Sequence, residues 1–101
     1  MRTIVKELCG KERVLKLGSR QKAMYENLTG KSFFSDVMPS YTDQVAMLRS
    51  ALSFSDKRIT EEQTFDIIDE IGDAEFFKII AELMEAVADE LEGIENAIPT
   101  K

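Results

Sequence analysis

Residues 73–98 decide the fold, and they read DAEFFKIIAELMEAVADELEGIENAI. Large apolar side chains recur in this stretch at steps of three and four residues, and acidic side chains stand between them. The apolar positions are Phe76, Ile80, Leu83, Val87, Leu91, Ile94 and Ile98. Because an α-helix has about 3.6 residues per turn, this spacing places them on one helix face. We therefore predict a long amphipathic helix that Asp73 caps and Pro99 ends.

The first third of the chain predicts a β-hairpin followed by a shorter helix. Residues 3–8 and 13–17 are rich in Ile, Val and Leu, and they flank a turn that contains Gly10. Two such runs around a glycine-containing turn are typical of a hairpin. Residues 19–29 then predict a helix, with a serine at its start and Gly30 ending it in the left-handed conformation.

The middle of the chain predicts two more helices. Residues 33–38 form an apolar cluster that could be one further helical turn or an irregular lid over the core. A helix capped by Thr42 or Asp43 is expected next. Thr60 and Gln63 then have the spacing of a capping box, in which each side chain binds the backbone N–H of the other. This third helix is expected to present Phe65, Ile68 and Ile71 to the core and to end at Gly72.

Length and composition predict a single domain spanning residues 1–101. Apolar residues make up 44% and charged residues 32% of the chain, which is a globular composition. The expected fold class is α+β, mainly α: an N-terminal β-hairpin followed by four or five helices, of which the last is long and amphipathic. No apolar run approaches the roughly 20 residues that cross a bilayer, and Lys6 and Glu7 interrupt the N-terminal apolar residues too early for a signal peptide. We expect a cytoplasmic protein.

Few residues are suited to chemistry. The chain has no histidine, and Cys9 is its one cysteine, so a catalytic Cys–His pair and a structural zinc site are excluded within one chain. Gly30, Lys31 and Ser32 resemble the end of a phosphate-binding loop, but Tyr25 occupies the position where that motif requires its first glycine. We therefore nominate no catalytic residue, no metal ligand and no cofactor.

Charge is distributed unevenly along the chain. Residues 1–59 contain 11 Lys/Arg and 6 Asp/Glu, a net charge of +5, and residues 60–101 contain 2 Lys/Arg and 13 Asp/Glu, a net charge of −11, which sum to −6. The acidic excess argues against nucleic acid and anionic membrane as main partners. A basic part and an acidic part could instead attract each other between copies, and such a head-to-tail contact builds rings or spirals.

The order of segments resembles the tail assembly chaperones of siphophages and prophages. The likeness is carried by YENLTGKS at residues 25–32 followed by two phenylalanines, by MLRSAL at residues 47–52, by TEEQTFDIID at residues 60–69, and by the long C-terminal helix. It covers nearly the whole chain, and it consists of segment order and loose pattern.

The resemblance implies a function and its partners. Such chaperones bind the tape measure protein, keep this long helical chain soluble and help to recruit tail tube subunits, and they self-assemble into spirals. We would then expect three partners for this chain, namely the tape measure protein, the tail tube protein and further copies of itself, in the cytoplasm of a bacterial host.

Two other classes of function stay open. The chain could be a small acidic regulatory adaptor, of phage or bacterial origin, that binds a host protein, and a clustered acidic face would favour this. It could also be an enzyme that uses carboxylates, which would need convergent acids of perturbed pKa in a pocket.

The sequence supports two sets of candidate contact residues. For binding a protein partner we nominate exposed aromatic and apolar positions, namely Phe33, Phe34, Leu91, Ile94 and Ile98. For self-assembly we nominate acidic positions that would meet basic residues of another copy's N-terminal part, namely Glu82, Glu85, Asp89 and Glu92.

Overall fold

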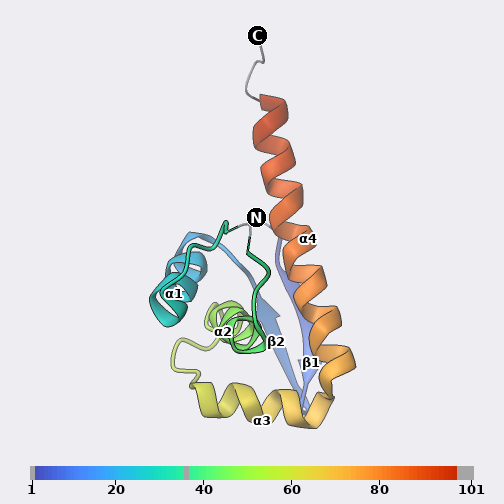
Figure 1. Ribbon diagram of the computed structural model, residues 1–101. Coiled ribbons are helices and arrows are strands. Elements are labelled where there is room, and N and C mark those ends of the chain that lie inside the picture. Colours follow the sequence, from blue (N-terminus) through green and yellow to red (C-terminus); the bar gives the residue numbers. More distant parts are fainter. Residues whose placement is uncertain (1, 36, 98–101) are drawn as a thin grey trace.

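The computed structural model describes residues 2–35 and 37–97, with side chains described as far as Leu91. Within these residues a two-stranded hairpin, β1 (Ile4–Leu8) and β2 (Lys11–Leu15), precedes four helices (Figure 1). The helices are α1 (Ser19–Thr29), α2 (Tyr41–Leu52), α3 (Glu61–Ile71) and α4 (Asp73–Ala97). The predicted fold class, α+β and mainly α, is confirmed.

The hairpin turns more tightly than the sequence suggested. Its antiparallel register runs from Ile4 opposite Leu15 to Leu8 opposite Lys11, so the loop has only two residues. Cys9 and Gly10 both have positive φ angles, 57° and 74°, as a turn that matches the twist of the two strands requires. The second strand therefore begins at Lys11, two residues before the predicted start.

Local hydrogen bonds set the ends of α1 and α2. Gly30, at φ 70°, ends α1 as predicted, and its N–H donates to the Glu26 carbonyl over 2.8 Å. The predicted cap of α2 is wrong by two to three residues, because Ser40 is the cap. The Ser40 Oγ accepts from the Asp43 N–H over 3.1 Å, and the Asp43 carboxylate accepts from the Ser40 N–H over 3.1 Å. Residues 33–35 and 37–39 form the irregular connection, not a further helix.

The start of α3 is confirmed in detail. Thr60 and Gln63 exchange two side-chain-to-backbone hydrogen bonds of 3.0 Å each, the expected capping box. Gly72, at φ 87°, ends the helix. The buried apolar side chains of α3 are Ile67 and Ile68, whereas Phe65 is exposed, contrary to the prediction.

The turn at Gly72 leads directly into α4. The Phe76 N–H donates to the Gly72 carbonyl over 3.0 Å, so Gly72 occupies the cap position and Asp73 is the first helical residue. The predicted capping role of Asp73 is therefore wrong, and its carboxylate accepts a 2.7 Å hydrogen bond from the Tyr41 hydroxyl instead.

One core unites the hairpin and the helices. It includes Leu8 and Leu15 from the hairpin, Leu48 from α2 and Phe76 from α4, all at most 2% exposed. Burial along α4 continues to Val87. The C-terminal part of this helix extends past the rest of the body (Figure 1). The molecule is correspondingly elongated, with extents of 49 × 27 × 25 Å.

Candidate protein-binding surface

The face of α4 beside its buried face carries exposed apolar side chains. Phe77, Met84 and Leu91 are seven residues apart, and because two helical turns span about 7.2 residues, they form one line along the helix. Their side chains are 44%, 38% and 42% exposed. At a rise of about 1.5 Å per residue, this apolar stripe is about 21 Å long.

Tyr41, at the start of α2, extends the apolar stripe. Its ring lies 5.4 Å from Phe76 and 6.0 Å from Phe77, edge-on to both, and it is 44% exposed. The hydrogen bond from its hydroxyl to Asp73 fixes the ring and raises the pKa of the phenol. The exposed aromatic surface near the start of α4 is therefore held in a defined orientation.

Phe77, Met84 and Tyr41 were not among the residues nominated from the sequence, although a signal was present for the two residues in α4. Phe77, Met84 and Leu91 have the same seven-residue spacing as Phe76 and Leu83, shifted by one position. A second heptad line beside the core line indicates a helix that is apolar over more than one face. Tyr41 could not be found in this way, because it comes from a different helix.

The acidic side of α4 faces β1 of the same chain. Lys6 lies 2.8 Å from Glu82, and Arg2 lies 3.5 Å from Glu85 and 3.2 Å from Asp89. Figure 1 shows β1 running beside α4. The basic N-terminal residues thus meet three of the nominated acids within the monomer, and the predicted pairing between copies competes with this arrangement. Each such surface ion pair is worth about 0–1 kcal/mol.

Phe33 and Phe34 have different surroundings in the α1–α2 connection. Phe33 is buried, with its ring edge-on to Tyr25 at 5.5 Å. Phe34 is 57% exposed, and the Lys22 ammonium lies 5.7 Å from the centre of its ring. The expectation that Phe33 contacts a partner is therefore wrong, because this ring fills the core. The nomination of Phe34 stays a prediction.

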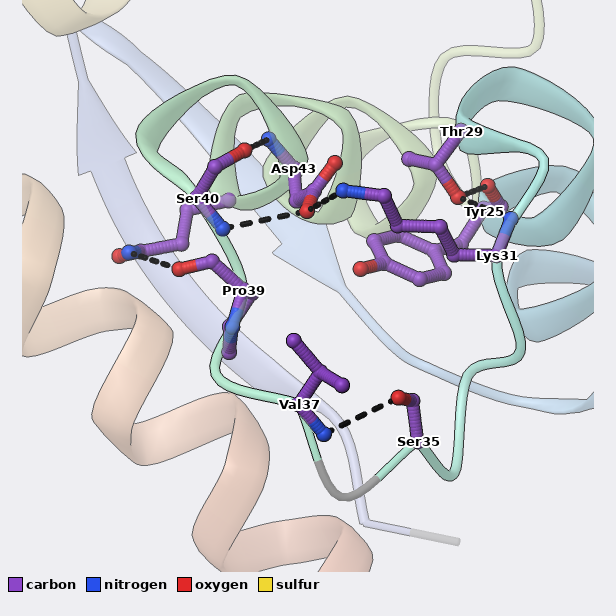
Figure 2. A network of polar contacts seen from close by, with 9 residues as sticks. Tyr25, Thr29, Lys31, Ser35, Val37, Pro39, Ser40 and Asp43 are labelled. Atoms are coloured by element: carbon purple, nitrogen blue, oxygen red, sulfur yellow. Dashed lines mark hydrogen bonds and ion pairs between the residues drawn. The ribbon is translucent and has the colours of Figure 1, made fainter.

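The exposed connection is fastened at both ends, and Figure 2 shows the network near α2. The Lys31 ammonium donates to the Asp43 carboxylate over 2.8 Å, and the same oxygen accepts from the Ser40 N–H (Figure 2). The hydrogen bond from Lys31, and then those with Ser40, hold the pKa of the Asp43 carboxyl below its usual value despite burial, which acts in the opposite direction. Lys31 thus ties the connection to α2, and the residues that resembled a phosphate-binding loop serve local structure.

The nominated residues near the end of α4 divide into two groups. Leu91 is exposed and belongs to the apolar stripe. The side chains of Glu92 and Ile94, and all of Ile98 and Pro99, lie outside the described part of the chain.

The reactive groups that are described do not form a chemical centre. Cys9 lies between the hairpin and α3, where desolvation and then the carboxylate of Glu70 raise the pKa of its thiol to about 11. A thiol with this pKa is protonated at neutral pH and a poor nucleophile. Among residues 2–35 and 37–91, no group of three or more His, Cys, Asp or Glu side chains is arranged to hold a metal ion. The helices within the described residues include none with the length and apolar character of a membrane span.

Comparison with protein-family models, with curated proteins and with solved structures found no match to this chain.

Proposed function

We propose that this chain is a tail assembly chaperone that binds an amphipathic helical client, the tape measure protein, and also binds further copies of itself. The observation that carries the proposal is the apolar stripe, Phe77, Met84 and Leu91, together with Tyr41 beside it. Helices that present apolar residues every seven positions associate by packing side chains into each other's gaps. A client helix with its own apolar face is the partner that such a stripe fits.

The dimensions of the stripe support a helical client. Its length of about 21 Å corresponds to about four turns of a second helix. Tyr41 and Phe77 place two aromatic rings at one end, and aromatic side chains are enriched among the residues that dominate binding energy. One such contact is weak, but many copies along one long client gain strength from effective concentration. This arrangement would keep a long apolar helical chain soluble before the tail tube subunits surround it.

The acidic side of α4 supports the chaperone over a regulatory adaptor that mimics nucleic acid. A mimic needs uncompensated negative charge, whereas Glu82 lies within 3.5 Å of Lys6 in β1, and Glu85 and Asp89 lie within 3.5 Å of Arg2. The pKa of the Asp43 carboxyl is lowered from its usual value, whereas a carboxylic acid that acts as a general acid needs a raised pKa. These features favour the protein-binding proposal over a carboxylate-based enzyme.

Co-expression tests the proposal. The client is a fragment of the very long helical protein that we expect the neighbouring gene to encode. This fragment is produced in bacterial expression cells with and without this chain. The proposal predicts that the fragment is soluble and co-purifies only when the chain is present. A fragment that stays insoluble in both cases, with no chain bound to it, would count against the proposed client.

A further inference from the structure

A groove lined by cations lies between the start of α1 and the end of α2, and it is here called the basic groove. Its volume is about 610 Å³, within the range of about 300–1,000 Å³ that is typical of sites for a compact ligand. Three cations line it, Lys16, Arg20 and Lys57, and the described residues around it include no carboxylate. No described residue of α4 lines it, and Figure 1 shows α1 and α4 on opposite sides of the body. The basic groove is therefore separate from the apolar stripe.

The three cations of the basic groove have no acidic partner within the described part of the chain. Other cations lie within 3.6 Å of a carboxylate, namely Arg2, Lys6, Arg13 and Lys31. Among the described residues, no carboxylate forms an ion pair with Lys16, Arg20 or Lys57. A shortage of acids does not explain this, because the chain has 19 Asp/Glu and 13 Lys/Arg. The fold thus leaves positive charge at the basic groove that an anionic ligand can neutralise.

The start of α1 adds to the positive potential of the basic groove. Residues 18–21 line the groove, and the first turn of α1 has no acidic side chain. The N-cap is Gly18, which offers no side-chain acceptor to the free N–H groups of this turn. Because helix N-termini attract anionic groups, the dipole of α1 acts in the same direction as the three cations.

The basic groove also contains apolar surface. Phe54 is 40% exposed, and the Lys16 ammonium lies 5.2 Å from the centre of its ring. Met24, which is partly buried, lines the same groove. An exposed aromatic ring among cations fits a ligand that combines an apolar group with negative charge, because each part then meets surface of the matching kind.

We propose that the basic groove binds a short acidic segment of another protein, in which an aromatic or large aliphatic side chain stands among carboxylates. The apolar side chain packs on Phe54 and Met24, and the carboxylates lie against the cations and the start of α1. Clusters of cations recognise acidic motifs in this way in many binding domains. Nucleic acid fits less well, because a strand of phosphates would extend beyond the groove over a chain whose net charge is −6. The inference goes beyond the proposed function, because it concerns a different surface and a different kind of recognition.

Fluorescence anisotropy of a synthetic peptide tests the inference. The probe is a fluorescein-labelled peptide in which one phenylalanine is flanked on both sides by aspartate and glutamate. We expect saturable binding to the unmodified chain at submillimolar concentration, and this binding should weaken as salt is added, because salt screens the charges. A second probe replaces the acids by asparagine and glutamine, and a third replaces the phenylalanine by alanine. Each altered probe should bind more weakly than the first, because the inference requires both the negative charge and the apolar side chain.

Charge reversal in the basic groove locates the probe. The groove variant carries Arg20→Glu and Lys57→Glu, and it should bind the acidic probe at least about tenfold more weakly, because like charges then face each other. Its control carries Lys11→Glu and Lys78→Glu, which change the net charge equally at exposed positions outside the groove. We expect this control to bind at least about fivefold more tightly than the groove variant.

A second pair of variants tests the apolar contact. Phe54→Gln removes the exposed ring from the basic groove, and Phe65→Gln removes a ring of similar exposure, 39%, from α3. We expect Phe54→Gln to weaken binding of the acidic probe and Phe65→Gln to leave it unchanged. Circular dichroism should show that all four variants are folded, because every substituted side chain is exposed.

Several results would overturn the inference. These are no saturable binding of the acidic probe at millimolar chain, equal binding by the groove variant and its control, and tighter binding of a single-stranded oligonucleotide of the same net charge. The proposed function is tested separately, because the groove variant should still keep the client fragment soluble. The variant Phe77→Gln with Leu91→Gln should in turn still bind the acidic probe, and loss of the probe in that variant would place it on the apolar stripe and contradict the inference.

Discussion

The apolar stripe can be tested by removing it without disturbing the core. The double variant Phe77→Gln with Leu91→Gln shortens the stripe at both ends, and the two side chains are 44% and 42% exposed. Substitutions at such exposed positions usually change the free energy of unfolding by less than about 0.5 kcal/mol each. The chain should therefore fold normally, and any loss of client binding should reflect the lost contact.

The size of the loss follows from the exposed fractions. Fully burying a Phe or Leu side chain is worth about 1.5–3 kcal/mol. About four-tenths of each side chain remains for a partner to cover, so each contributes about 0.6–1.2 kcal/mol on docking and the pair about 1.2–2.4 kcal/mol. Since about 1.4 kcal/mol corresponds to a factor of ten, the affinity for the client should fall about 7- to 50-fold.

Fluorescence anisotropy of a labelled client fragment, titrated with the chain, measures this loss. The matched control is Phe65→Gln with Leu28→Gln, which removes the same residue types at 39% and 41% exposure from other helices. We expect the control to bind within about twofold of the unmodified chain. Equal affinities for the stripe variant and the control would refute the reasoning, because the apolar stripe would then be no different from other exposed apolar surface.

Three further predictions concern stability and reactivity. Phe76→Ala should lower the free energy of unfolding by about 3–5 kcal/mol, because this side chain is fully buried. Phe77→Ala should lower it by less than about 0.5 kcal/mol. Equal losses in urea unfolding would contradict the assignment of Phe76 to the buried face of α4 and Phe77 to the exposed face. Asp43→Ala should cost about 1 kcal/mol at neutral pH, because it removes the carboxylate that accepts the Ser40 N–H in the capping box of α2. The pKa of Asp43 is lowered in the folded state from its ordinary 3.8, so its stabilisation is complete above that pH and is lost as the pH falls through the lower folded value; a loss that is as large at about pH 2 as at neutral pH would be inconsistent with this. Cys9, with a pKa of about 11, should react slowly with iodoacetamide at neutral pH and faster as the pH rises towards that value, and Glu70→Gln should shift the rate profile to lower pH; an unshifted profile would show that the carboxylate has no influence on the thiol.

The parts of the fold that local chemistry determines could be predicted from the sequence. The capping box of Thr60 and Gln63 is confirmed because both partners lie within one helical turn and depend on nothing else. Gly30 and Gly72 end their helices because both need a positive φ angle that other residues rarely adopt. The core face of α4 is confirmed for the same kind of reason, since one repeated spacing places Phe76, Ile80 and Leu83 together.

The parts that depend on contacts between distant segments could not be predicted. Periodicity shows that Glu82 and Asp89 share a side of α4, but it does not show that β1 brings Lys6 and Arg2 against that side. The same limit applies to Phe33, whose burial depends on its contact with Tyr25, which belongs to α1. The two Ile-, Val- and Leu-rich runs that form the hairpin strands were visible, whereas the exact length of the turn between them was not.

The basic groove between the start of α1 and the end of α2, lined by Lys16, Arg20 and Lys57, illustrates why a surface feature is harder to predict than a helix. Its cations come from three separate places, Lys16 after β2, Arg20 in α1 and Lys57 between α2 and α3. The sequence showed only that the N-terminal part is basic. The fold gathers three of these charges around Phe54, which no pattern along the chain could indicate.

The central claim, that this chain acts by binding protein and also binds itself, is tested most directly by light scattering of the purified unmodified chain across a concentration series from micromolar to millimolar. The account predicts a mass that rises steadily above the 11.4 kDa of one chain as the concentration increases, and that rises further when the client fragment is added. A mass that stays at 11.4 kDa throughout, with and without the client fragment, would contradict it.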